Sequence, residues 1–220
     1  MNKVRLASRD LKISRSDYLQ NYYLWKNIEW AVAKALQETS KNIPFVLDVG
    51  CGNKPYADLF KSCYYQGLDR TTDDSSPDIV GDAVNIPVDT STVDIVFTTQ
   101  VIEHVPDPQA MVRECYRVLK PGGFLILTGP FYWPLHEEPY DFHRFTKYGL
   151  ENLLRQAGFS EWEIKPDGGD WAQILLSINL RLSRRWLLPL RIITNCIGIM
   201  LDKLNPRYNS PSNYTLLAKR

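Results

Sequence analysis

Residues 44–56 read Pro44-Phe-Val-Leu-Asp-Val-Gly-Cys-Gly-Asn-Lys-Pro-Tyr56. The run from Phe45 to Val49 is short, apolar and rich in β-branched residues, and it ends abruptly at Gly50 and Gly52. This pattern predicts a buried strand followed by a tight turn. Glycine lets the backbone adopt positive φ and approach a ligand closely, so bare N–H groups can face it. Pro55 suits the first position of a helix, whose N-terminus would face the same ligand.

Two kinds of nucleotide ligand compete for this turn. A dinucleotide fingerprint, G-x-G-x-x-G, needs a third glycine, and this chain has Pro55 there. Asp48, just inside the strand end, would face a pyrophosphate unfavourably but can accept hydrogen bonds from a cationic or polyhydroxyl ligand. S-adenosylmethionine carries an ammonium group, a sulfonium and a ribose but no phosphate. Pro55 and Asp48 therefore both favour S-adenosylmethionine over NAD. NAD remains the alternative ligand, and it would make the chain a dehydrogenase.

The same residues resemble motif I of the class I S-adenosylmethionine-dependent methyltransferases, in particular the large methyltransferase type 11 family. That family commonly has D-x-G-x-G-x-G, and this chain matches it at Asp48, Gly50 and Gly52, with Lys54 in place of the last glycine. The resemblance covers about residues 44–165 and, less closely, the last strand. It implies S-adenosylmethionine as the cofactor, bound around the turn by Asp48, Gly50, Cys51, Gly52 and Asn53.

Carboxylates stand at the ends of three predicted strands in succession, Asp48 being the first. The strand Tyr64-Tyr-Gln-Gly-Leu68 ends at Asp69, at about the spacing from the turn at which an acidic residue reaches ribose hydroxyls. Asp82 follows a short third strand, and the resemblance implies that Asp82 and the backbone of Ala83 contact adenine. A solvated turn aspartate is the alternative for Asp69. The remaining predicted cofactor contacts are Arg70 and Gln100.

Strands alternate with helices through the middle of the chain. Predicted strands cover Val93 to Thr98, Phe124 to Thr128 and Phe159 to Lys165, with helices from Pro108 to Leu119 and from Thr146 to Ala157 between them. This alternation predicts an α/β fold, a doubly wound and mostly parallel Rossmann-like sheet that binds ligands at the carboxyl ends of its strands. The resemblance adds seven strands, with the last one antiparallel.

We expect a single domain over residues 1–220. Its parts are an N-terminal helix (16–41), a cofactor-binding core (44–166), a helical insertion (171–205) and a final strand (213–218). The aromatic stripe of the N-terminal helix is typical of core packing, and a lid over the cofactor is the alternative.

All three histidines, His104, His136 and His143, fall in the loops after the fourth and fifth strands, where a substrate beside the cofactor would lie. His143 is the first candidate for the general base, and Asp141 and His104 are the next catalytic candidates. Loop placement and irregular spacing weigh against a metal held by His136, His143 and a carboxylate, so none is expected. The predicted substrate contacts are His136, Glu137, Tyr140 and Arg144.

The segment from His136 to Thr146 contains the pattern H-x-x-P-x-D-x-x-R-x-T. It resembles type 11 members often associated with bacterial surface-glycan and sugar pathways. The resemblance implies O-methylation of a small molecule, a sugar or a lipid-linked glycan. A carboxylate or phenolate acceptor would need no base, whereas a sugar hydroxyl would benefit from one. A non-catalytic S-adenosylmethionine-binding module remains the alternative.

Composition narrows the choice of partner and compartment. The chain carries 26 Lys+Arg against 25 Asp+Glu, a balance that does not point to a nucleic-acid partner. Scattered cysteines and an N-terminus without an apolar segment indicate a cytoplasmic protein. The insertion 171–205 is apolar and basic, but Arg191 interrupts its longest apolar run. It could lie on the inner face of the membrane, pack on its own domain or form a homodimer contact.

Overall fold

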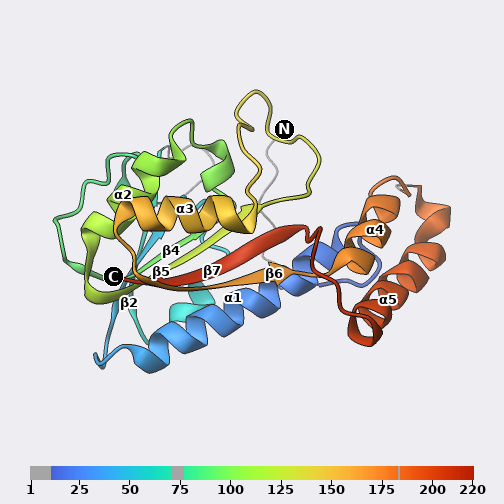
Figure 1. The fold of residues 1–220 in the computed structure, drawn as a ribbon, viewed down its shortest axis with the longest axis horizontal. Helices are drawn as coiled ribbons and strands as arrows, with labels where there is room; N and C mark the ends of the chain where they lie inside the picture. The colour runs from blue at the N-terminus through green and yellow to red at the C-terminus, as the bar shows by residue number, and fades with distance from the viewer. Residues whose placement is uncertain (1–10, 71–76, 183) are drawn as a thin grey trace.

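The computed structural model describes residues 11–70, 77–182 and 184–220. Its centre is a seven-stranded sheet with helices on both faces (Figure 1). The strand order is β3-β2-β1-β4-β5-β7-β6. The strands are β1 (Phe45–Val49), β2 (Tyr64–Asp69), β3 (Ile79–Val80), β4 (Val93–Thr99), β5 (Leu119–Pro130), β6 (Glu161–Asp167) and β7 (Asn213–Lys219).

The direction of the strands matches the expectation from the sequence. Strands β1 to β5 pair in parallel, whereas β7 runs antiparallel to both of its neighbours, β5 and β6. Every residue of β4 is buried, as expected for a central strand with both faces covered by helices. The predicted doubly wound, mostly parallel α/β sheet with an antiparallel last strand is confirmed.

Helices cover the two faces of this sheet (Figure 1). Helix α1 (Tyr18–Glu38) lies on one face, and α2 (Pro108–Val118) and α3 (Lys147–Ala157) lie on the other. Alternate strand residues therefore face different cores: Val46 packs with α1, and its neighbour Leu47 packs in the core that contains α2 and α3.

Helices α2 and α3, on the face opposite α1, have capping residues at their ends. Asp107 accepts a hydrogen bond from the Ala110 amide at the start of α2, and Thr146 accepts one from Gly149 at the start of α3. Gly158 ends α3 in the left-handed conformation. These signals explain why both helices could be located from the sequence.

The short helix predicted after the glycine turn, from Tyr56 to Lys61, is present but is not an α-helix. A four-residue 3-10 helix, Ala57–Phe60, stands there, and Pro55 lies before it rather than at its first position. Aromatic packing holds this segment, because Tyr56 stacks on Trp25 and Phe60 contacts Phe97 edge to face. The turn therefore has no α-helix N-terminus to offer to a ligand.

The element boundaries differ around β5 and β6. Helix α2 stops at Val118, and β5 begins at Leu119 because this buried residue pairs with Val93 of β4. The segment from Pro121 to Gly123, which has the residue types that commonly follow a helix, lies inside β5. Strand β6 starts two residues later than predicted, since Phe159 packs against Tyr116 instead of entering the sheet.

The predicted insertion contains helices α4 (Asp170–Asn179) and α5 (Leu188–Leu204) beyond the end of the sheet (Figure 1). Buried polar contacts join them, because Asn179 donates to Asn195 at 2.7 Å and Asp202 accepts from the Gly169 amide at 2.7 Å. Large apolar side chains remain exposed on this pair. Among the described residues, no helix is long and apolar enough to cross a membrane.

A buried carboxylate joins α1 to the antiparallel strands. Asp167, at the end of β6, is 1% exposed and accepts hydrogen bonds from Asn27 at 2.6 Å and from Thr215 at 2.9 Å. Burial raises the pKa of Asp167 to about 7, and the hydrogen bonds from Asn27 and Thr215 only partly oppose this effect. Protonation of Asp167 therefore favours the folded state.

We predict that the free energy of unfolding falls as pH rises from about 4 to above 7 through the contribution of Asp167. The sign follows because the folded protein holds this proton more tightly than the unfolded chain. Asp167→Asn keeps an acceptor for Asn27 and removes the ionisable group. Urea unfolding near pH 5 and near pH 8 should give a flatter pH dependence for Asp167→Asn. Identical pH dependence in both proteins would contradict the assignment.

Candidate active site

Two adjoining cavities lie at the carboxyl ends of β1, β2 and β4. The histidine cavity, of about 200 Å³, is lined by residues that include Asp48, His104 and His136. The aspartate cavity, of about 500 Å³, is lined by residues that include Asp69 and Asp82. Residues common to both linings are Gly50, His104 and Glu137. An elongated ligand can therefore occupy both cavities, with its middle beside Gly50.

The glycine turn keeps its amides for the protein itself. Gly50 and Cys51 donate to the Leu68 carbonyl at 2.8 Å and 3.0 Å, and the Gly52 amide donates to Asp69 at 2.8 Å. The prediction of bare N–H groups facing the ligand is therefore wrong for these three residues. A phosphate would find none of these three donors available. Lys54 adopts φ +54° where the related motif has glycine, and its ammonium group pairs with Asp78 at 2.8 Å.

Asp48 is nearly buried at the end of β1 and lines the histidine cavity. Its carboxylate accepts a hydrogen bond from the hydroxyl of Tyr65 on the neighbouring strand β2. Burial raises the pKa of Tyr65, and the negative charge of Asp48 raises it further, so the hydroxyl remains a donor. The motif gave no sign of this contact. Strand pairing could have suggested it, because Tyr65 lies opposite Val46, two residues before Asp48.

Cys51 also lines the histidine cavity. Burial raises the pKa of its thiol to about 12, and the charges of Asp48 and Asp69 contribute. The thiol is therefore protonated and is unsuited to act as a nucleophile.

The aspartate cavity has two carboxylates with fixed orientations. Asp69 accepts from the Gly52 amide through one oxygen and from the Arg70 amide through the other, at 2.7 Å. Asp82 accepts from the Val84 amide at 3.1 Å and lies 3.5 Å from the Arg70 guanidinium. Each carboxylate oxygen can accept more than one hydrogen bond. Both side chains can therefore bind hydroxyl or amine donors without giving up these contacts.

The predicted site residues separate into two groups. Those that line the two cavities are Asp48, Gly50, Cys51, Asp69, Arg70, Asp82, Ala83, Gln100, His104, His136, Glu137 and Tyr140. Those that line neither of them are Gly52, Asn53, Asp141, His143 and Arg144. The expected first base, His143, lies between Phe142 and Phe145, with Nε2 3.4 Å from the Pro106 carbonyl oxygen.

Asp141 and Arg144 form a bidentate ion pair that shapes the loop after β5. The guanidinium of Arg144 donates to the two oxygens of Asp141 at 2.6 Å and 2.7 Å, and it also donates to the Trp133 carbonyl at 3.1 Å. The Arg144 guanidinium holds the pKa of Asp141 far below its usual range. Asp141 is therefore a poor proton acceptor, and its place in the structure is that of a loop clamp.

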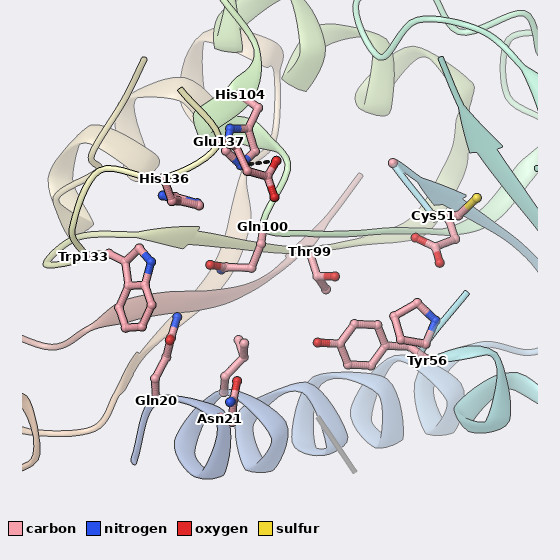
Figure 2. Close-up of a pocket in the computed structure, with 14 residues that line it drawn as sticks. Gln20, Asn21, Cys51, Tyr56, Thr99, Gln100, His104, Trp133, His136 and Glu137 are labelled. Carbon is pink, nitrogen blue, oxygen red and sulfur yellow. Dashed lines mark ion pairs between the residues drawn. The ribbon is translucent and has the colours of Figure 1, made fainter. Parts of the chain in front are cut away.

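Two imidazoles meet at the wall of the histidine cavity (Figure 2). The rings of His104 and His136 lie 4.9 Å apart, edge to face. Nδ1 of His104 lies 2.7 Å from the Tyr140 carbonyl oxygen, and its Nε2 lies 3.6 Å from Glu137. Burial lowers the pKa of His136, although the nearby Asp141 opposes this effect.

A carboxylate lies beside these imidazoles and completes a set of metal-ligand types. Glu103 is fully buried, and one ligand atom each from Glu103, His104 and His136 falls within 4.8 Å of the others. This set differs from the pair His136 and His143 considered from the sequence. The structure keeps His143 out of it.

Several residues that line the histidine cavity were missed from the sequence. Gln20 and Asn21 come from the start of α1, so polar residues of that helix, rather than its aromatic stripe, face the cavity (Figure 2). Leu24, Pro55, Tyr56, Thr99 and Trp133 complete this group. A pair of amides within an apolar helix was the available signal for the first two. Trp133 lies in an irregular loop whose path the sequence does not reveal.

Comparison with known proteins places this arrangement in context. Residues 47–127 match a family described as a methyltransferase domain. The chain is 31% identical over 110 residues to a tRNA (carboxymethyluridine(34)-5-O)-methyltransferase of Arabidopsis thaliana, covering 46% of this chain and 27% of that protein. It is 36% identical over 102 residues to a ubiquinone biosynthesis O-methyltransferase of Xanthomonas oryzae, covering 38% of this chain and 41% of that protein.

The fold is similar to that of an Archaeoglobus fulgidus SAM-dependent methyltransferase. The TM-score is 0.59 at 17% identity, covering 90% of this chain and 99% of that one. The chain spans only about a quarter to a half of the length of the curated relatives it matches. The family match runs from β1 into β5 and includes Asp48, Asp69 and Asp82.

The close packing of the glycine turn leads to a stability prediction. Gly50 has φ +74°, and a Cβ there would lie 2.4 Å from Cγ2 of Val101. Gly122 has φ +79°, but a Cβ there would meet nothing within 4 Å. Gly50→Ala should therefore lower the free energy of unfolding by about 1–3 kcal/mol more than Gly122→Ala. Both substitutions introduce the strain of an alanine at positive φ, but only the new Cβ at position 50 overlaps a neighbouring side chain. Equal losses in denaturant titrations would contradict this packing.

Proposed function

The chain belongs to the class I S-adenosylmethionine-dependent methyltransferases, and from that premise we propose that it methylates an oxygen of a small-molecule acceptor. The acceptor class that we propose is a sugar or lipid-linked glycan hydroxyl. The observation that carries the proposal is the pair of adjoining cavities, with Asp48 on one side and Asp69 and Asp82 on the other. This layout matches a ligand with a cationic end, a central ribose and a terminal base.

In the proposed pose, Asp69 accepts hydrogen bonds from the ribose hydroxyls, and Asp82 and Ala83 contact adenine in the aspartate cavity. Asp48 faces the ammonium group of the methionine end in the histidine cavity. The methyl group then lies near Gly50 and His104, where the two cavities meet. Gly52 contributes by orienting Asp69 through its amide rather than by touching the cofactor. The amides of Gly50, Cys51 and Gly52 already donate to Leu68 and Asp69. This argues against NAD, because its pyrophosphate would need those amides as donors.

Methyl transfer from a sulfonium is an in-line displacement. The acceptor oxygen supplies the electron pair of the new O–C bond, and the electrons of the broken S–C bond stay on sulfur. Much of the acceleration can come from holding the oxygen behind the methyl carbon. The acceptor would enter at the end of the histidine cavity that contains Trp133 and His136 (Figure 2). Aromatic and amide groups together suit a ligand that has both apolar faces and hydroxyl groups.

Among the three histidines, His104 is our candidate for contact with the acceptor oxygen. It lines both cavities, whereas His143 lines neither. The proposal therefore moves the leading role from His143 to His104. Asp141 and Arg144 become positioning residues, because their ion pair holds the loop that contains His136 and Glu137.

Two further observations support, first, oxygen as the methylated atom and, second, a lipid-linked acceptor. Both curated relatives described above carry O-methylation in their names. Helix α5 exposes Ile193, Met200 and Leu204, which are 53%, 50% and 74% exposed. We propose that this apolar surface lies against lipid when the acceptor is lipid-linked. The neutral charge balance argues against a tRNA acceptor for this chain.

Transfer of a labelled methyl group tests the function. The chain is incubated with methyl-labelled S-adenosylmethionine and with free monosaccharides, catechol, or a polyprenyl-linked glycan in liposomes. We expect label on a sugar hydroxyl, with His104→Gln lowering the rate about 100-fold or more and His143→Gln having a much smaller effect. Cofactor binding without transfer to any acceptor would favour a non-catalytic binding module. A larger loss in His143→Gln would restore the sequence-based assignment.

A further inference from the structure

We propose that Glu103, His104 and His136 bind a divalent transition-metal cation at the wall of the histidine cavity, and that this cation holds the acceptor oxygen. The role of the cation towards the acceptor rests on the proposed function. Its binding to the chain does not, since it depends on these three side chains alone.

The positions of the three residues come from two separate elements. The 3-10 helix Ile102–His104, directly after β4, carries Glu103 and His104, and the loop after β5 brings in His136. Their ligand atoms lie within 4.8 Å of one another, and Nε2 of His104 is 3.9 Å from Glu103 Oε1. Ligands bound at about 2.0–2.2 Å in a tetrahedral site lie about 3.4 Å apart. Small side-chain movements would therefore close the site.

The tautomer of His104 suits a metal ligand. Its Nδ1 lies 2.7 Å from the Tyr140 carbonyl oxygen, which can only accept, so Nδ1 carries the proton. In the neutral ring Nε2 then carries the lone pair, and this atom faces Glu103 and Glu137. A backbone carbonyl that holds the remote nitrogen of a ligating histidine is the usual arrangement in metal sites.

His136 is held in the same way. Its Nδ1 lies 3.2 Å from Asp141 Oδ2 and 3.3 Å from the Pro134 carbonyl oxygen, both of which are acceptors. Its backbone amide also donates to Asp141 at 3.0 Å. The bidentate pair between Asp141 and Arg144 thus fixes the ring that would ligate the metal. This gives Asp141 a defined role as a positioning residue.

The local charge favours a cation. Three carboxylates, Glu103, Glu137 and Asp141, surround the two imidazoles, and Arg144 offsets one of them through its pair with Asp141. Glu103 is 0% exposed, and a carboxylate removed from water is costly unless positive charge accompanies it. Arg144 supplies part of that charge to Glu103. A bound dication would add to it at the centre of the cluster.

The donor set indicates which cation binds. Two imidazoles and one carboxylate favour a transition-metal dication such as Zn²⁺ over Mg²⁺ and Ca²⁺, which prefer oxygen ligands. Three protein ligands leave a coordination position open for an oxygen from outside, as in catalytic zinc sites. Glu137 is 3.6 Å from His104 Nε2 and half exposed, so it can join as a further ligand or move away when the acceptor enters.

A cation here would lower the pKa of a bound sugar hydroxyl. The hydroxyl proton would pass to water, and the oxygen would attack the methyl carbon while the S–C electron pair stays on sulfur. The cation would be unchanged. The rival role for His104 is direct proton acceptance by Nε2, which needs no cation.

Metal titration separates these roles. The full chain is freed of metal with a chelator and titrated calorimetrically with ZnCl₂ and with MnCl₂, and Co²⁺ absorption reports the coordination geometry. We expect one equivalent to bind, with His136→Gln and Glu103→Gln lowering the affinity about 10-fold or more. His143→Gln is the matched control, because it removes a histidine of the same loop that lies outside the cluster, and it should bind as the wild type does.

The proposal fails if no saturable binding occurs, or if His143→Gln loses as much affinity as His136→Gln. Glu103 is buried, so His136→Gln carries the test if Glu103→Gln does not fold. S-adenosylhomocysteine titration of the same proteins keeps the two proposals apart. Zinc binding without cofactor binding would overturn the proposed function and leave the metal site. Cofactor binding without zinc binding would overturn the metal site and make His104 a direct base.

Discussion

The carboxyl end of β2 holds the glycine turn of β1 in place. The Leu68 carbonyl accepts the amides of Gly50 and Cys51, and the Asp69 carboxylate accepts the amide of Gly52. These hydrogen bonds use the donors that a dinucleotide site would keep for phosphate. They also fix Asp69 at the edge of the aspartate cavity. One set of contacts therefore closes the turn, excludes one class of ligand and orients the carboxylate that we propose for the ribose.

An ion pair organises the other side of the site. Asp141 and Arg144 hold the loop after β5, and Asp141 directly holds both the amide and the ring of His136. The loop has little regular structure, so its shape depends on such side-chain contacts rather than on a backbone ladder. We propose that Asp141, expected to be catalytic, and Arg144, expected to contact the substrate, act mainly by positioning their neighbours. His104 gains its position differently, from the 3-10 helix that follows β4.

The sheet could be predicted because its strands are short apolar runs that end in carboxylates or turn residues. Buried parallel strands leave that pattern whatever the loops around them do. Asp48, Asp69 and Asp82 could be placed at this edge of the sheet for the same reason, since each lies within two residues of the end of a strand. The amides of the glycine turn were assigned wrongly because their acceptor, Leu68, belongs to another strand. No local pattern in residues 44–56 predicts that the turn amides bond to β2.

The relative positions of the histidines could not be predicted from the sequence. His136 and His143 are seven residues apart in one loop, and only the folded path of that loop separates the first, beside His104, from the second, between two phenylalanines. Gln20 and Asn21 reach the cavity from a helix that precedes the core in the chain. Such contacts depend on how elements pack, which helical spacing and charge do not determine.

The central claim is that the two cavities bind S-adenosylmethionine and that Asp69 holds its ribose. Calorimetric titration of the wild type and Asp69→Ala with S-adenosylmethionine, S-adenosylhomocysteine and NAD tests it most directly. The account predicts saturable binding of the two sulfur compounds, no binding of NAD, and an affinity about 10-fold or more weaker in Asp69→Ala. Binding of NAD without the sulfur compounds, or an unchanged affinity in Asp69→Ala, would contradict it.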